Sequence, residues 1–161
     1  MEMNADNYAE YYQDQLKAAG EYQDYVCEKL HYVGIVLQNM TSQKYQYEKR
    51  ENLLGLEIKF DNRMQETKRI YIETAEKSNP QNPNYIPSGI YRDDGSWLYG
   101  IGNYDIFYIF DKKVLQRIDK HDPSWLYRPH QNLPTSKGFC IPVEQAEKIA
   151  ALTVNLSQRR E

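Results

Sequence analysis

The hydrophobic pattern of this chain changes its period near residue 50, and that change limits the folds that it can adopt. Upstream, apolar side chains recur every three or four positions, at Tyr22, Val26, Leu30, Val33 and Leu37. Downstream they alternate with polar ones, at Leu54, Leu56, Ile58 and Phe60. The first period is that of an amphipathic helix, and the second is that of a strand with one buried face. The pattern therefore predicts a mixed α/β fold that begins with a long helix.

The rest of the chain continues this mixture. We expect one helix over 5–38, or two that meet near Gly20, because no proline interrupts this segment. Ile70 and Ile72 indicate a second strand, joined to the first by a polar, hairpin-like connection over 61–68. Further strands are expected at 96–102, 104–110 and, as the last strand, 137–142, with a short helix over 112–120 and a final helix from Pro142 through Leu152. The proline-rich segments 78–89 and 121–136 are expected to be surface loops.

Length and composition fit one soluble domain. The 161 residues can bury a self-sufficient core, and 15 tyrosines argue against disorder. No apolar run approaches the roughly 18–20 residues of a membrane span, and the N-terminus lacks the features of a signal peptide. We therefore expect a cytoplasmic protein without a membrane partner. Cys27 and Cys140 lie far apart without CxxC spacing, so they predict buried thiols and not a disulfide or a zinc site.

The net charge of −3 does not by itself indicate a nucleic-acid-binding protein. Its distribution weakens that objection, because much of the acidity lies in the first 28 residues while basic residues cluster at 44–50, 68–69 and 112–120. These clusters fit either solvated faces or phosphate contacts. Several aromatic residues near them, Tyr127 among these, are candidates either for the core or for stacking on exposed bases.

Residues 51–61, ENLLGLEIKFD, hold the candidate catalytic residues. On a strand, Glu57, Lys59 and Asp61 project from one face about 6.5–7 Å apart, opposite the apolar side chains. Glu51 can bring its carboxylate beside that of Glu57 across a turn. Two carboxylates and the Ile58 carbonyl form an all-oxygen ligand set that suits Mg²⁺ or Mn²⁺. Lys59 can then stabilise charge on a phosphoryl transition state or, with a lowered pKa, help to orient or deprotonate water.

An acidic residue, a short gap and Glu-x-Lys on a core strand resemble the PD-(D/E)XK phosphodiesterase superfamily, which includes restriction enzymes and Holliday junction resolvases. Residues 20–152 also look like small members of phage or mobile-element type. The resemblance implies one restriction-endonuclease-like α/β domain over 1–161, with a central mixed β-sheet flanked by helices. It implies that Glu51 and Glu57 bind the metal with the Ile58 carbonyl, and that Lys59 is the catalytic lysine. The first acid is Glu instead of the commoner Asp, which leaves Glu48 as the alternative to Glu51.

Three further residues are candidates for accessory roles. In some relatives an acid on the first helix also faces the site, and Asp24 lies near that place. Glu73, on the strand after the motif, can face the same cleft, and Asp61 can assist Lys59. The expected function is hydrolysis of DNA by water, with Mg²⁺ or Mn²⁺ as the cofactor and homodimer formation left open. The alternatives are a catalytically inactive DNA- or protein-binding module on the same fold, or a structural protein whose charged strand face forms ordinary salt bridges.

Overall fold

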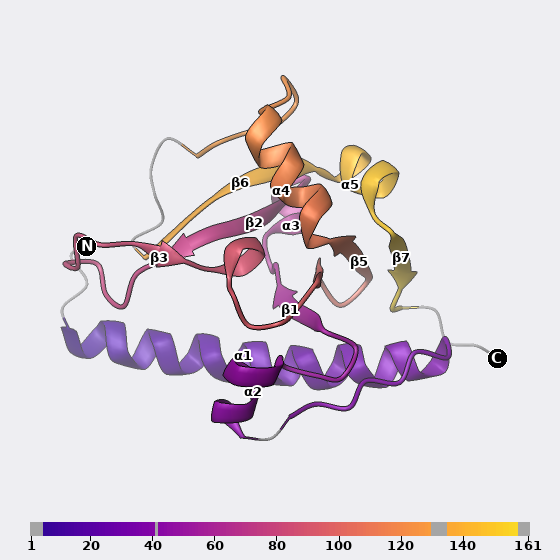
Figure 1. Ribbon diagram of the computed structural model, residues 1–161, viewed down its shortest axis with the longest axis horizontal. Coiled ribbons are helices and arrows are strands. Elements are labelled where there is room, and N and C mark those ends of the chain that lie inside the picture. Colours follow the sequence, from indigo (N-terminus) through magenta and orange to yellow (C-terminus); the bar gives the residue numbers. More distant parts are fainter. Residues whose placement is uncertain (1–4, 41, 130–134, 158–161) are drawn as a thin grey trace.

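The segment with the helical period forms one long helix, and the segment with the alternating period forms a strand that packs on it (Figure 1). The computed structural model describes residues 5–40, 42–129 and 135–157. Helix α1 spans Ala5–Tyr32 and passes Gly20 without a break, and the space around this glycine is open. It ends before the expected residue 38 because Gly34 adopts a φ of +85° and the Ile35 N–H bonds back to the Leu30 carbonyl, which is a glycine-dependent helix stop.

Four strands form a mixed sheet in the order β1-β4-β5-β7. They are β1 (Leu56–Phe60), β4 (Leu98–Gly102), β5 (Ile106–Asp111) and β7 (Leu152–Asn155). Strand β1 pairs with β4 in parallel, and the other pairs are antiparallel. The expected mixed β-sheet flanked by helices is therefore confirmed. It leaves one edge of β1 unpaired with any other strand among the described residues.

A second, antiparallel sheet has the order β3-β2-β6, with β3 at Ile86–Pro87, β2 at Arg69–Glu76 and β6 at Ser136–Pro142. The hairpin-like connection expected between β1 and β2 is wrong, because these strands belong to different sheets. The short helix α3 (Met64–Thr67) lies between them and buries Met64 in the core. Asp61 holds this corner by accepting backbone N–H bonds from Arg63 and Tyr71, both at 3.0 Å.

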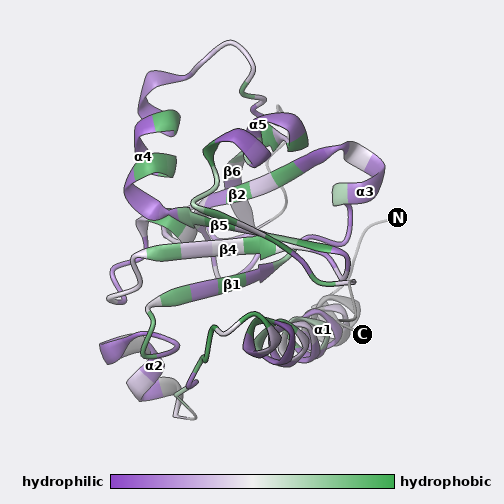
Figure 2. Cartoon of the chain, turned by 90° about the vertical axis from the view of Figure 1, so that its right-hand side faces the viewer, coloured by the Kyte–Doolittle hydropathy of each residue, from purple (hydrophilic) through white to green (hydrophobic). Residues whose placement is uncertain are grey.

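Two apolar cores lie on opposite faces of the four-stranded sheet. Figure 2 shows α1 on one side of this sheet and β2, β6, α4 and α5 on the other. The first core joins Tyr22, Val26 and Leu30 of α1 to Leu56 and Phe107 of the sheet. The second core fills the space between the two sheets and receives Leu115 from α4 (Lys112–His121) and Ala146 from α5 (Val143–Ile149). Strand β1 thus lies between α1 and the inter-sheet space.

Several local features differ from the sequence-based expectations. Helix α2 (Gln43–Lys49) was not expected, and the proline-rich loop over 78–89 contains β3 and the start of the 3₁₀ helix η1 (Gly89–Tyr91). The final helix stops at Ile149, and Leu152 begins β7 instead of lying on a helical stripe. Strand β7 pairs with the edge of β5 that β4 leaves free. This long-range contact outweighs the helical spacing of the apolar residues in this segment. Part of the loop over 121–136 lies outside the described residues.

Neither cysteine forms a disulfide, and each thiol is only half-buried. Asn39 donates a side-chain hydrogen bond to the Cys27 sulfur, and burial raises the pKa of both thiols. Among the helices that the structure describes, none is long and apolar enough to cross a bilayer.

Candidate active site

The two faces of β1 carry different chemistry. Leu56, Ile58 and Phe60 belong to the core against α1, as the alternation predicts. Glu57 and Lys59 project from the other face, into the space between the two sheets. Glu57 is completely buried, whereas the Lys59 side chain keeps about 30% of its surface exposed. The motif strand therefore presents a buried carboxylate and a partly accessible ammonium group side by side.

Glu57 lies at the centre of a cluster of charged side chains from four segments of the chain. One of its carboxylate oxygens lies 2.9 Å from the Lys59 Nζ, and the other lies 2.8 Å from the Lys112 Nζ. Lys112 begins α4, is only 3% exposed, and lies 3.7 Å from the Asp94 carboxylate. The Lys59 ammonium also lies 4.0 Å from the Glu73 carboxylate of β2. This group, the β1 ion cluster, consists of Glu57, Lys59, Glu73, Asp94 and Lys112.

The ion cluster shifts the ionisation of its members. Burial alone would raise the pKa of Glu57, but the ammonium groups of Lys59 and Lys112 outweigh it and lower that pKa. Burial would likewise lower the pKa of Lys59, but the Glu57 and Glu73 carboxylates raise it above the ordinary lysine value. Both groups are therefore charged at neutral pH. Of the two roles that the sequence leaves open for Lys59, the raised pKa favours charge stabilisation over the role that requires a lowered pKa.

Glu73 is held in place by two serine hydroxyls. The Ser88 hydroxyl donates to one carboxylate oxygen at 2.6 Å, and the Ser136 hydroxyl donates to the other at 3.0 Å. Ser88 reaches this position because Gly89 packs directly on β2, where a Cβ would lie 2.3 Å from the Glu73 carbonyl oxygen. Glu73 therefore faces the motif strand, as expected, and its orientation is set by elements on both sides of it.

Glu51 lies along the free edge of β1. The Ile58 N–H donates to the Glu51 carboxylate at 3.4 Å, and the Asn52 side chain bonds both the N–H and the carbonyl of Leu56, at 3.0 and 2.6 Å. In a β-strand, the N–H and the C=O of one residue point to the same edge, and successive residues alternate between the two edges. The Ile58 carbonyl therefore points to the same free edge as the Ile58 N–H. The Glu51 carboxylate and the Ile58 carbonyl therefore share the free edge of β1.

The carboxylate of Glu51 and the Ile58 carbonyl at this edge, and the Glu57 carboxylate on the inner face, are all oxygen groups of the kind that bind a divalent cation. Burial raises the pKa of Glu51, and the negative charge of Glu57 raises it further. The two carboxylates therefore repel each other, and a cation between them would relieve that repulsion. Mg²⁺ and Mn²⁺ favour carboxylate and carbonyl oxygens, which are the groups present here. The described residues contain no group of three or more His, Cys, Asp and Glu side chains arranged around a metal, so water or substrate would complete the coordination.

The structure gives the other sequence candidates different places. Asp24 is exposed on α1, and its carboxylate, like that of Glu51, lies near enough to the Cys27 thiol to add to the effect of burial in raising the pKa of that thiol. The Asp61 carboxylate accepts backbone N–H bonds at the β1–α3 corner, whereas Lys59 contacts Glu57 and Glu73. Glu48 is half-exposed on α2, 3.9 Å from Lys44. Of the two candidates for the first acid, Glu51 is the one that reaches β1.

Sequence reasoning did not identify Asp94 or the two serines, and it treated Lys112 only as part of a basic cluster. Lys112 is the first of two lysines that follow a buried strand, which is an ordinary helix start. Asp94 lies in a turn where its carboxylate accepts the Ser96 N–H, and that is also the usual role of an Asp in such a segment. Their burial beside Glu57 depends on how β4 and β5 place these turns against the start of β1.

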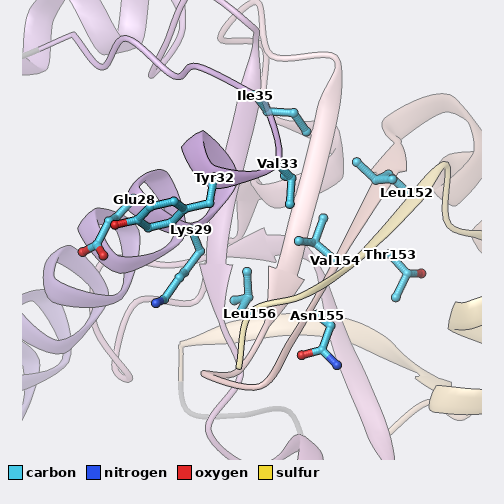
Figure 3. A pocket seen from close by; sticks show the side chains of 10 residues that line it. All are labelled: Glu28, Lys29, Tyr32, Val33, Ile35, Leu152, Thr153, Val154, Asn155 and Leu156. Atoms are coloured by element: carbon cyan, nitrogen blue, oxygen red, sulfur yellow. The ribbon is translucent and has the colours of Figure 1, made fainter. Parts of the chain in front are cut away.

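Two cavities differ in their relation to the ion cluster. One, of about 500 Å³, opens beside Lys59 and Glu73 and extends between β1, β2 and the loop before β6. The other, of about 620 Å³, lies between the end of α1 and β7 (Figure 3). Its lining residues are Glu28, Lys29, Tyr32, Val33, Ile35, Leu152, Thr153, Val154, Asn155 and Leu156, none of which belongs to the ion cluster. Of these two cavities, the smaller one adjoins Lys59 and Glu73.

Comparison of the chain with known protein families, with characterised proteins and with solved structures gave no match.

Proposed function

We propose that this chain is a metal-dependent phosphodiesterase that hydrolyses DNA by means of an activated water. The observation that carries the proposal is the arrangement around β1. Glu51 reaches the backbone of Ile58 at the free edge of the strand, while Glu57 and Lys59 extend from its inner face. The PD-(D/E)XK resemblance implies this combination of two acids, an intervening carbonyl and a lysine.

Glu51, Glu57 and the Ile58 carbonyl would hold Mg²⁺ or Mn²⁺. When bound, such an ion lowers the pKa of a water ligand and offsets negative charge on a phosphate. Lys59 is protonated at neutral pH because its carboxylate neighbours raise its pKa, so it supplies positive charge and hydrogen-bond donors to the phosphate. This supports charge stabilisation over proton abstraction, the other role expected for Lys59. Glu73, fixed by its two serine partners, orients the Lys59 ammonium.

Lys112 has a separate role in this scheme. It neutralises Glu57 from the buried side, so the carboxylate can stay ionised without contact with water. Lys59, on the accessible side, is the ammonium group that can exchange its contact with Glu57 for a contact with substrate.

The test is the cleavage of plasmid, linear and branched DNA by the purified chain with Mg²⁺ or Mn²⁺ and with excess EDTA. We expect cleavage that requires the metal, that is lost in Glu57→Gln and that is kept in Glu144→Gln, a matched change at an exposed position on α5. Cleavage that persists in EDTA, or that Glu57→Gln leaves unchanged, would contradict the proposal.

One observation favours the alternative of a catalytically inactive binding module on the same fold. Both oxygens of the fully buried Glu57 already contact lysine ammonium groups, so the charge of this carboxylate is compensated without a metal. This alternative predicts binding of DNA or of a protein that EDTA does not affect, and no cleavage under any of the conditions above.

A further inference from the structure

We infer that the cavity beside Lys59 binds one unpaired nucleotide of the substrate strand, so that single-stranded or branched DNA is preferred over continuous duplex. The inference rests on the proposed function, because the nucleotide would adjoin the phosphate that Lys59 contacts. The cavity has a volume of about 500 Å³ and is lined at one end by Lys59 and Glu73. Sites for small ligands typically occupy about 300–1,000 Å³, so one nucleotide fits in it.

The lining of the cavity combines apolar and aromatic surface. Tyr99 and Ile101 of β4 are almost completely buried, and Tyr71 of β2 lies beside them in the lining. Tyr127, in the loop before β6, is 41% exposed and offers its ring at the opening. The guanidinium carbon of Arg69 lies 4.5 Å from the centre of this ring. A nucleobase can extend this arginine–tyrosine stack, because aromatic rings and guanidinium planes both pack on the face of a base.

The charges at the cavity favour a phosphate. Arg63 and Arg69 both line it, both are exposed, and neither forms an ion pair within the described part of the chain. Other arginines differ: Arg92 contacts Glu76 at 2.9 Å, and Arg128 contacts Asp119 at 2.9 Å.

The two carboxylates in the same lining are already engaged. Asp61 accepts two backbone N–H bonds, and Glu73 accepts two serine hydroxyl bonds and lies beside Lys59. The groups left available to a ligand are therefore the two guanidinium groups, which suit a phosphodiester.

Stacking on the Tyr127 ring requires a base with a free face, and this sets the preference for an unpaired nucleotide. A base within a continuous duplex reaches a pocket only by leaving its stack and its pair, and this step costs free energy that an already unpaired base does not require. A flap, a junction or a single strand provides such a base next to a phosphate. Duplex DNA can still meet Arg63 and Arg69 through its backbone, but its bases would not reach Tyr127.

The experiment measures DNA binding in EDTA by fluorescence anisotropy, which requires no cleavage. The probes are a single-stranded 20-mer, the same sequence as a duplex, and a duplex with a single-stranded flap. We expect the single strand and the flap to bind at least about 10-fold more tightly than the duplex. Tyr127→Ala should weaken single-strand binding by about 5- to 100-fold, the range for the loss of one base stack, and Tyr127→Phe should restore it. Arg69→Ala should weaken binding and reduce its salt dependence by about one phosphate contact.

Arg117→Ala is the matched control, because it removes one exposed positive charge on α4 outside the cavity. It should lower the affinity for the three probes equally and slightly. Equal binding of single strand and duplex by the wild type, or a Tyr127→Ala variant that binds the single strand normally, would overturn the inference. Metal-dependent cleavage could then still occur, so the proposed function would stand. Conversely, a Tyr127-dependent preference in a chain that never cleaves DNA would support the cavity and contradict only the nuclease.

Discussion

The two faces of β1 are both buried, but by opposite physical means. Toward α1, Leu56 is fully buried and Phe60 stacks on Tyr22 with ring centroids 4.5 Å apart. Toward the second sheet, Glu57 is buried to the same extent, but its neighbours are the ammonium groups of Lys59 and Lys112. Consecutive residues of one strand therefore contribute to an apolar face and to an ionic face.

The two faces contribute differently to the stability of the fold. Apolar burial stabilises a fold by about 25 cal/mol per Å². A buried ion cluster contributes little net stability, because the cost of removing charges from water offsets their attraction, and an apolar group of similar size often does as well. The α1 face thus accounts for the position of β1. The proposed function would account for the charges that are kept on the ionic face.

The largest expected effect comes from a change on the ionic face, and it is an effect on activity. Lys59→Ala removes the accessible ammonium and should lower DNA cleavage by about 10²- to 10³-fold or more, as for the loss of one transition-state donor. Lys112 still neutralises Glu57, so the variant should remain folded. The measurement is the single-turnover rate with Mg²⁺, with DNA binding and the melting temperature as readouts of structure. Lys148→Ala, an exposed change on α5, is the control. Cleavage by Lys59→Ala at the wild-type rate would remove Lys59 from the mechanism.

On the opposite face the expected effect is on stability. Leu56→Ala should lower the free energy of unfolding by about 2–5 kcal/mol, because it leaves a cavity between β1 and α1. Urea denaturation measures this loss, and Val36→Ala, which truncates an exposed side chain, should cost far less. At urea-free conditions where Leu56→Ala is still folded, its cleavage rate should match that of the wild type. A loss below about 1 kcal/mol would show that the apolar face does not hold the strand as argued.

The sequence was sufficient to predict both faces of β1, because the alternation that separates Leu56 and Ile58 from Glu57 and Lys59 is local. It did not predict the partner of the strand. Strand β1 pairs with β4, far along the chain, and not with β2, because strand pairing depends on tertiary contacts that alternation alone does not specify. Strand β7 was missed for the same reason, since its four residues form a strand only because β5 has an open edge.

The candidate site was predictable to a similar degree. The spacing of Glu51 and Glu57 predicts two neighbouring carboxylates, and the charge of Glu57 is one cause of the raised pKa of Glu51, after burial. The sequence did not predict the burial of Lys112, because two consecutive lysines at a helix start do not indicate which of them is buried. Its position follows from the β4–β5 pairing, which brings the end of β5 beside the start of β1.

The response to metal should depend on the ionic face and not on the apolar face. With Mg²⁺ or Mn²⁺ at about ten times its dissociation constant, mass action stabilises the wild type by about 1.4 kcal/mol and raises its melting temperature. Glu51→Gln and Glu57→Gln should each abolish this shift. Leu56→Ala should melt at a lower temperature than the wild type but show the same shift with metal. Thermal scans of the four proteins with metal and with EDTA measure it. Equal melting with and without metal in all four would leave the two carboxylates as parts of a salt-bridge network only.

The smallest effect concerns pH, and it should have opposite signs for the two carboxylates. Burial and the Glu57 charge raise the pKa of Glu51 above its ordinary value of 4.5, so without metal the folded protein holds this proton more tightly than the unfolded chain does. The contribution of Glu51 to stability therefore decreases as the pH rises from about 4.5 through the raised pKa. Glu51→Gln cannot ionise and should be more stable than the wild type at neutral pH in EDTA, with a difference that vanishes toward pH 4.

Glu57 should behave in the reverse way. Its folded pKa is lowered, because Lys59 and Lys112 outweigh the effect of burial, so its charged form stabilises the fold above pH 4.5 and this contribution is lost as the pH falls through the lowered pKa. Glu57→Gln should therefore be less stable than the wild type at neutral pH. Urea denaturation of the three proteins between about pH 2 and pH 8 in EDTA measures both slopes, the Glu51 slope above about pH 4.5 and the Glu57 slope below it. If Glu51→Gln destabilises the protein at neutral pH as Glu57→Gln does, then Glu51 is a structural partner of the Ile58 backbone, and the free edge of β1 holds no strained carboxylate for a metal to relieve.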